Sequence, residues 1–207
     1  VLNTGNPVRK DIIPTADKRE EAIRHFNLSP EKKTILSIGG SLGAGSINNS
    51  IIKELKQFET NEIQLLWQCG KNYYQKANEA LQHYSLPNVK IMDFINRMDL
   101  AYSAADVIIS RAGAGTISEL ALVNKPVILV PSPNVAEDHQ TKNARSLADK
   151  NAAIIIKDNE TQDKLIRETL NLIRNESKMQ ELKRNIQTFA KPDSAKTIAN
   201  EILKLTK

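Results

Sequence analysis

The feature that most constrains the fold is an apolar run that passes directly into a glycine-rich turn and then into a helix. The apolar run Val107–Ile109 is followed by the turn Arg111–Gly115 and by a helix predicted from about Thr116. A second apolar strand, Val127–Val130, leads through a polar loop to another helix that is predicted to begin near Asp138. Both helices start just past the carboxyl ends of strands, where open α/β sheets bind ligands. Because helix starts expose N–H groups and the positive end of the dipole, an anionic ligand such as a phosphate ester is expected there.

The same arrangement occurs earlier in the chain. The strand Thr34–Ile38 leads into the glycine-rich stretch Gly39–Ser46, and a helical pattern from Ile47 to Phe58 follows. Glycines let a backbone approach an anion closely, so this turn is a second candidate phosphate cradle, and a tight turn without a ligand is the alternative. The dinucleotide-binding pattern G-x-G-x-x-G fails, since a motif that starts at Gly39 would need glycine at Ser41. A Walker A loop fails as well, because it would need lysine where Ser46 stands.

Strand and helix patterns alternate along the rest of the chain, which predicts βαβ units and a parallel sheet. The fold class is therefore α/β, a Rossmann-like parallel sheet flanked by helices, and 207 residues suffice for one such domain. The further predicted strands are Ile63–Gln68, Val89–Phe94 and Ala153–Ile156. The further predicted helices are Lys18–Phe26, Tyr73–His83, Asp99–Ala104, Thr161–Asn175, Glu176–Ala190 and Asp193–Thr206.

Composition excludes several classes of protein. The formal charge of +5 suits phosphate ligands, but aromatic residues are only 4%, which argues against the stacking platforms of a nucleic-acid binder. Cys69 is the single cysteine, so neither an intrachain disulfide nor a cysteine-rich metal site is expected. The sequence has no apolar run near the ~20 residues of a membrane span and no visible signal peptide, so a cytoplasmic protein is predicted. The polar first segment, which begins without Met, suggests that an N-terminal partner domain is missing.

Few side chains near the predicted helix starts offer site chemistry. Glu119 lies one turn into its helix, where it could accept hydrogen bonds from ribose hydroxyls or simply complement its own helix dipole. Thr116 and Ser118 are candidates for N-cap residues or phosphate donors, and Gln140 can donate and accept at once, which suits sugar hydroxyls. His139 is not expected to bind a metal, because no pattern of further ligands completes a site. These residues predict a binding site without a general base.

Five segments in this order resemble the C-terminal half of the MurG family of bacterial N-acetylglucosaminyltransferases. They are GNPVR (Gly5–Arg9), GGSLGA (Gly39–Ala44), the pair Phe94–Ile95, SRAGAGTISE (Ser110–Glu119) and DHQTKNA (Asp138–Ala144). Each motif is weak by itself, but the ordered set is specific and extends over most of the chain. The resemblance implies one half of a two-domain GT-B glycosyltransferase, the half that binds the nucleotide-sugar donor.

The resemblance also implies roles for residues that match the motifs. The backbone of Ile95 would meet the uracil of UDP-N-acetylglucosamine (UDP-GlcNAc), and Glu119 would hold the ribose hydroxyls. Gly40, Ser41 and Thr116 would grip the diphosphate.

Four further positions follow from the same motifs. Ala114, through its backbone, His139 and Gln140 would approach the N-acetylglucosamine. Many family members have Gln at the position of His139, so this sequence departs from the pattern there. Arg9 matches the arginine of the family's GNPVR segment, and no specific contact is assigned to it.

The implied reaction is an inverting glycosyl transfer from UDP-GlcNAc to undecaprenyl-diphospho-muramoyl-pentapeptide (lipid I), which yields lipid II for peptidoglycan. It would need no metal and no cofactor, because helix dipoles and N–H groups would stabilise the leaving diphosphate. The catalytic base and the lipid I site would belong to an N-terminal acceptor domain that is absent here. We therefore expect this chain to bind donor without turnover, and the full-length protein to be peripheral on the anionic cytoplasmic face of the bacterial plasma membrane.

The expected organisation is a single donor-binding domain over residues 1–207, with 1–15 as an interdomain linker and 193–207 as a C-terminal helix. Three other functions remain open from the sequence. They are a non-catalytic nucleotide-sugar-binding subunit of a split glycosyltransferase, a UDP-GlcNAc epimerase-like enzyme, and a glycosyltransferase that acts on diacylglycerol. The sequence leaves the oligomeric state open.

Overall fold

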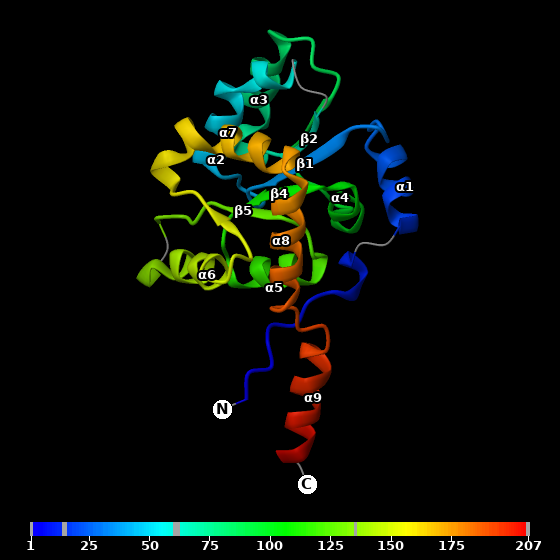
Figure 1. Cartoon of the computed structure of the whole chain (residues 1–207), viewed down its shortest axis with the longest axis vertical. Coiled ribbons are helices and arrows are strands. Elements are labelled where there is room, and N and C mark those ends of the chain that lie inside the picture. The colour runs from blue at the N-terminus through cyan, green and yellow to red at the C-terminus, as the bar shows by residue number, and fades with distance from the viewer. Residues whose placement is uncertain (1, 14–15, 60–62, 135, 206–207) are drawn as a thin grey trace.

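The computed structural model describes residues 2–13, 16–59, 63–134 and 136–205. These residues form a six-stranded, entirely parallel sheet with the strand order β3-β2-β1-β4-β5-β6, the doubly wound order of nucleotide-binding domains (Figure 1). The strands are β1 (Lys33–Ile38), β2 (Ile63–Gln68), β3 (Val89–Met92), β4 (Val107–Ser110), β5 (Val127–Leu129) and β6 (Ile154–Ile155). The predicted Rossmann-like fold class is confirmed.

The helices follow the strands in the predicted alternation. They are α1 (Ala16–His25), α2 (Gly45–Lys53), α3 (Lys71–Gln82), α4 (Met98–Ala104), α5 (Ala114–Val123), α6 (His139–Ala148), α7 (Thr161–Arg174), α8 (Glu176–Gln187) and α9 (Ser194–Leu205). Short 3-10 helices occur at η1 (Lys10–Ile12), η2 (Leu55–Phe58), η3 (Ala136–Asp138) and η4 (Asp158–Glu160). None of the described helices is long and apolar enough to span a bilayer.

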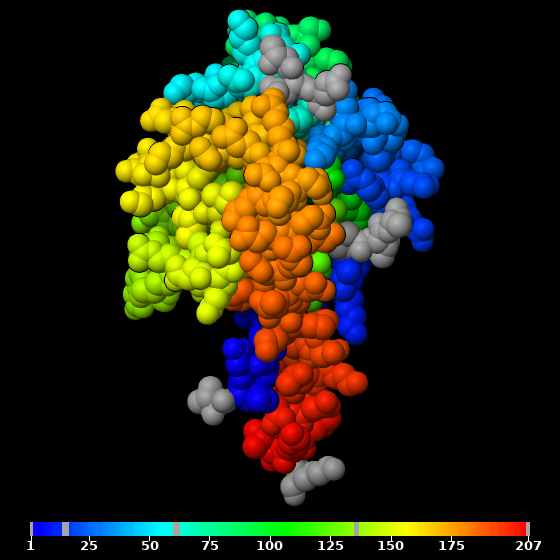
Figure 2. Space-filling view, in the orientation of Figure 1, coloured from blue at the N-terminus to red at the C-terminus, as the bar shows by residue number. Residues whose placement is uncertain are grey.

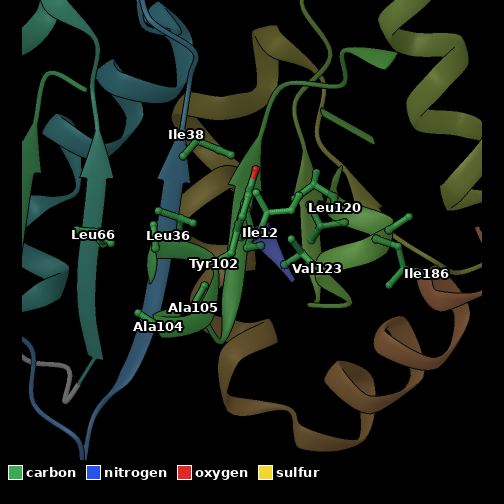
Figure 3. Packing of buried hydrophobic residues seen from close by; sticks show 14 of the residues in the cluster. Ile12, Leu36, Ile38, Leu66, Tyr102, Ala104, Ala105, Leu120, Val123 and Ile186 are labelled. Atoms are coloured by element: carbon green, nitrogen blue, oxygen red, sulfur yellow. The ribbon is translucent and has the colours of Figure 1, made fainter. Parts of the chain in front are cut away.

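Two hydrophobic clusters cover the two faces of the sheet. In β1, Leu36 and Ile38 pack into one cluster while Ile35 packs into the other, because successive side chains of a strand point to opposite faces. The first cluster joins the sheet to α1, α4, α5 and α6, and Figure 3 shows its centre around Tyr102 and Leu120. The second joins it to α2, α3 and α7. Helix α8 contributes to both, through Ile186 to the first and Leu182 to the second.

Several predicted boundaries shift in the structure. Helix α5 begins at Ala114 rather than Thr116, because Gly113 takes the N-cap position and Gly115 is helical. Strand β3 ends at Met92 rather than Phe94, since the N–H of Ile95 donates to the side chain of Gln68 instead of continuing the strand. The predicted residues 1, 14 and 15 of the linker and 206 and 207 of the last helix lie outside the described part of the chain.

The segment before α1 is partly docked and is not a solvated linker throughout. Ile12 is fully buried and Val8 packs against the first cluster. Asn6 donates from Nδ2 to the Ser118 hydroxyl on α5 at 3.0 Å. Gly5 lies against the start of α9, since a Cβ there would be 2.7 Å from the Ser194 hydroxyl oxygen. The first residues of this segment and the start of α9 therefore lie close together below the sheet in Figure 1.

Candidate functional site

The strand register aligns the carboxyl ends of β1, β2, β3 and β4. Gln68 of β2 pairs with Met92 of β3 and with Ile38 of β1, and Ile38 also pairs with Ser110, the last residue of β4. A cleft of about 360 Å³ opens at this level. The residues that line it are Ile38, Gly39, Gly40, Ser41, Gln68, Phe94, Ile95, Met98, Tyr102, Ser110, Arg111, Gly113, Thr116, Glu119 and Gln140. Segments far apart in the sequence thus meet at one edge of the sheet.

The turn between β1 and α2 offers backbone to this cleft. Gly40 and Gly43 have φ values of +78° and +83°, and the N–H of Gly43 donates to the carbonyl of Gly40 at 3.1 Å. Ser41 is exposed at the tip of the turn. Helix α2 begins with Ala44 at its N-cap, and no side chain caps it. The first N–H groups of α2 therefore remain available near the mouth of the turn.

Helix α5 presents a second open N-terminus. Gly113 is its N-cap and makes no side-chain cap hydrogen bond, and no acidic residue lies in its first turn. The expectation that Thr116 or Ser118 is the N-cap is wrong, since both lie inside the helix. Ser118 donates to the carbonyl of Ala114, while Thr116 lines the cleft. This arrangement suits a phosphate group, because no described side chain caps the first N–H groups and the dipole favours negative charge.

Glu119 is held by a buried tyrosine. The Tyr102 hydroxyl donates to Oε2 of Glu119 at 3.1 Å, and Tyr102 is only 1% exposed. Burial, followed by the nearby Glu119 charge, raises the pKa of Tyr102, so the phenol stays protonated as a donor. The other carboxylate oxygen of Glu119 has no hydrogen bond within the described residues, and it can accept from a ligand hydroxyl.

Gln140 is oriented by two backbone groups. Its Oε1 accepts from the N–H of Ser132 at 2.9 Å and from the N–H of Ala112 at 3.2 Å. Within the described residues no acceptor is bound to its Nε2. Gln140 was expected to donate and accept at once; the structure uses its acceptor internally and leaves the donor for a ligand in the cleft.

Arg111 and Gln68 are site residues that the sequence reasoning missed. Arg111 donates to the carbonyl of Val130 at 3.1 Å and to the Ser46 hydroxyl at 3.0 Å, and it pairs with Asp158. It thereby joins the turn after β4 to the start of α2, to the residue after β5 and to η4 at the edge of the cleft. Its position inside the glycine-rich turn Arg111–Gly115 was the sequence signal that could have identified it. Gln68 accepts the N–H of Ile95 at 3.0 Å, and only its position at a strand end pointed to it.

Of the nine predicted site residues, six line the cleft and three do not. Gly40, Ser41, Ile95, Thr116, Glu119 and Gln140 come together in it. Ala114 lines a neighbouring hollow of about 600 Å³ that also includes Asn6 and Ser118. His139 has a side chain 59% exposed and lies 3.5 Å from a Glu137 carboxylate oxygen. Arg9 has a side chain 60% exposed and lies 3.9 Å from Asp11. In the described part of the chain, no three His, Cys, Asp or Glu residues are grouped so as to hold a metal ion.

Comparison with known protein families gives one matching model. The model described as the glycosyltransferase family 28 C-terminal domain matches residues 34–198. All of the six residues named above as lining the cleft fall within this match.

Two relatives that match over almost the whole chain share one enzymatic description. A Bacteroides fragilis protein, 54% identical over 99% of this chain, is described as a UDP-N-acetylglucosamine--N-acetylmuramyl-(pentapeptide) pyrophosphoryl-undecaprenol N-acetylglucosamine transferase. A Bacteroides thetaiotaomicron protein with the same description is 52% identical over 99% of this chain. The chain spans 54% and 56% of the lengths of these two relatives.

Solved structures show the same fold. The crystal structure of Acinetobacter baumannii MurG is similar with a TM-score of 0.77 and 30% identity, covering 96% of this chain and 57% of that chain. A Neisseria meningitidis UDP-GlcNAc 2-epimerase, bound to UDP-GlcNAc, has a TM-score of 0.60 at 16% identity and covers 89% of this chain and 48% of that chain. At that identity the second likeness extends to the fold alone.

Proposed function

This chain belongs to the glycosyltransferase family 28 C-terminal domain family, and on that premise we propose that it is the donor-binding half of an N-acetylglucosaminyltransferase. Its sheet has the Rossmann-like form found in one half of GT-B glycosyltransferases. In the proposed organisation residues 1–207 form a single donor domain, 1–15 link it to an acceptor-binding half, and 193–207 end it as a helix. The descriptions of the Bacteroides relatives support UDP-GlcNAc as donor and lipid I as acceptor of the whole protein.

The observation that carries this proposal is the fixed carboxylate of Glu119, which lines the same cleft as the glycine turn after β1 and Thr116 in the first turn of α5. An acid in that position suits the ribose hydroxyls of a nucleotide, because a carboxylate accepts hydrogen bonds and repels phosphate. The diphosphate would then lie against Gly40, Ser41 and the first turn of α5, near Thr116. In the proposed layout the sugar lies on the side of Gln140, which lines the cleft and whose amide nitrogen can donate to a sugar oxygen.

Three residues outside the cleft complete the proposed donor site. We assign Ala114, through its backbone, and His139 to the N-acetylglucosamine, because they are the first residues of α5 and α6. We also assign Arg9 to the donor site, because the segment Gly5–Arg9 resembles the GNPVR motif of the MurG family.

The chemistry proposed for this half is stabilisation of the leaving group. As the glycosidic bond to the sugar breaks, negative charge develops on the diphosphate of UDP. The N–H groups at the start of α5, which no described side chain caps, and the backbone of the glycine turn after β1 can stabilise that charge without a metal or another cofactor. Inversion requires a base on the opposite face of the sugar, and we assign the base and the acceptor site to the other half of the protein.

Calorimetric titration tests the donor assignment. We expect saturable binding of UDP and UDP-GlcNAc and none of NAD, and UDP-GalNAc reports discrimination at the sugar. Glu119→Ala should weaken UDP binding about tenfold or more, since tenfold corresponds to about 1.4 kcal/mol. Glu20→Ala removes the same charge from the exposed face of α1 and should leave binding unchanged. Absence of uridine-nucleotide binding, both here and in the full-length protein, would refute the proposal.

Turnover separates this half from the whole enzyme. With UDP-GlcNAc and lipid I, the 207-residue chain should form no lipid II, because the base and the acceptor site lie elsewhere in the proposed enzyme. The full-length protein should form it under the same conditions. Lipid II production by this chain alone, measured by incorporation of labelled N-acetylglucosamine, would contradict the division of roles.

The proposed location is the cytoplasmic face of the plasma membrane, with the full-length protein bound peripherally. The acceptor named for the relatives carries an undecaprenol chain, which resides in a membrane. The net charge of +5 on this half favours an anionic surface.

A further inference from the structure

Gln68 has one hydrogen-bonding group in use and another facing the cleft. It is only 5% exposed, and its Oε1 accepts the N–H of Ile95 at 3.0 Å. Because that N–H is a donor, it fixes which end of the carboxamide is the oxygen. Within the described residues, Nε2 has no hydrogen-bond partner. Among the described residues, the fully buried side-chain polar atoms that lack a partner are Ser37 Oγ and Asn124 Oδ1. Nε2 of Gln68 lacks a partner but is not one of these atoms, so it is accessible to solvent. Since Gln68 lines the cleft, that access is through it.

The apolar end of the cleft lies beside Gln68. The anion-binding groups gather at the ends of β1 and β4, and Glu119 contacts α4 through Tyr102. Toward β2 and β3 the lining changes to Phe94, Ile95 and Met98, and the Phe94 side chain is 48% exposed. A planar base fits this end, because aromatic and apolar side chains pack against its faces while phosphate and ribose lie at the polar end.

The free groups at this end match one edge of uracil. Uracil offers an N3–H donor between two carbonyl acceptors. The N–H of Ile95 already donates to Oε1 of Gln68. The carbonyl oxygen of Ile95 accepts no hydrogen bond in the described structure and can receive N3–H. The donor for a flanking carbonyl is then Nε2 of Gln68. Cytosine reverses the polarity at N3 and at one flanking group, so it fits this pair poorly.

We propose that Gln68 is a specificity-determining residue, whose Nε2 donates to one of the two carbonyl oxygens that flank N3 of the donor's uracil. This inference rests on the proposed function, since it needs a uridine nucleotide in the cleft. It adds a side-chain contact to the backbone contact at Ile95, and it makes the Ile95 carbonyl, not its N–H, the partner of the base.

Thio-substituted nucleotides test the contact directly, because sulfur is a weaker acceptor than oxygen. We would titrate UDP, 2-thio-UDP and 4-thio-UDP into this chain and into the full-length protein. One of the two analogues should bind about three- to tenfold more weakly than UDP, the loss of one hydrogen bond. In Gln68→Ala, the affinity for UDP itself should fall by a similar factor. The difference in affinity between UDP and that analogue, the thio penalty, should then disappear.

Two variants distinguish recognition of the base by Gln68 from a purely structural role of Gln68 as the acceptor of the Ile95 N–H. Gln68→Glu at pH 8 keeps an acceptor for the Ile95 N–H but replaces the donor, so it should lose the thio penalty as Gln68→Ala does. Gln64→Ala removes a buried glutamine from the same strand outside the cleft and should retain the penalty. An unchanged penalty in both Gln68 variants, or none in the unaltered protein, would overturn the inference. Failure of UDP itself to bind would instead contradict the proposed donor site.

Discussion

Three polar side chains in this cleft are each held by hydrogen bonds to one of their atoms, and each has a second polar atom that can bind a ligand. Glu119 accepts from Tyr102, Gln140 accepts from two backbone N–H groups, and Gln68 accepts from Ile95. A side chain that is held in place before binding loses little further freedom when the ligand arrives. The supporting hydrogen bonds should therefore affect affinity although they touch no ligand.

Tyr102→Phe tests this support at Glu119. It removes the hydroxyl that donates to Oε2 at 3.1 Å and changes little volume. We expect UDP binding to weaken about three- to tenfold, because a hydrogen bond of this kind contributes about 0.5–1.5 kcal/mol. The matched variant Tyr84→Phe alters a tyrosine that packs against the other cluster and should leave the affinity unchanged. An equal affinity for UDP in both variants would show that Tyr102 does not prepare Glu119.

The lowered pKa of Lys125, which lies away from the cleft, leads us to expect that the stability of the fold depends on pH. Burial lowers its pKa to about 8; the Asp106 charge opposes this shift, and Arg19 and Lys183 add to it. The unfolded chain, with a lysine pKa near 10.4, holds more protons between pH 8 and about 10.4. The free energy of unfolding should therefore rise with pH over this range. In Lys125→Met that rise should be smaller, as measured by urea unfolding at steps from pH 7 to 10. Parallel pH profiles for the two proteins would contradict it.

At the scale of elements, two neighbouring turns share one close contact. The turn after β1 packs its Gly43 against the turn after β2, where a Cβ on Gly43 would lie 2.1 Å from the carbonyl oxygen of Cys69. Gly70 is equally constrained, since its own Cβ would lie 2.2 Å from the Gly43 nitrogen. The glycines therefore serve packing between elements as well as access for a ligand.

Gly43→Ala and Gly40→Ala separate these two requirements. Both positions have positive φ, so each alanine should cost about 1–2 kcal/mol in backbone strain. A Cβ at Gly40 meets no atom within 4 Å, whereas at Gly43 it overlaps fixed backbone. We expect Gly43→Ala to destabilise the chain clearly more than Gly40→Ala in urea unfolding. Equal losses would mean that the two turns can move apart at little cost.

At the scale of the whole molecule, α9 stands away from the sheet. Figure 2 shows it projecting below the body of the protein with the first residues beside it. Its residues Ile202 and Leu205 are 57% and 88% exposed, although its sequence is amphipathic. The core therefore does not depend on the distal part of α9.

Ile202→Glu and Ile186→Ala should differ strongly in their effect on stability. Ile202 lies on the exposed surface of α9, so its replacement should change the free energy of unfolding by no more than about 0.5 kcal/mol. Ile186 of α8 is fully buried in the first cluster, and removing its side chain should cost about 2–5 kcal/mol. Thermal unfolding of the two variants measures the difference. A large loss in Ile202→Glu would show that α9 packs on the domain in solution.

The sequence by itself determined the fold class and the edge of the sheet at which the cleft lies. Both follow from local properties: the alternation of apolar runs with helical periodicity, and glycines placed where each strand passes into a helix. The same local signals placed the start of α5 two residues late, at Thr116, because an N-cap without a capping side chain leaves no mark in the residue pattern.

Only the tertiary structure decided which atoms of the site are free. The partner of Glu119 is 17 residues away in sequence, that of Gln68 is 27 away, and Arg111 reaches Ser46 across 65. No local pattern encodes such pairings, since they depend on strand order and on the register that brings the strand ends to one level. Six residues of the cleft could therefore be named from the sequence, while Arg111, Gln68 and the orientation of the side chains required the folded chain.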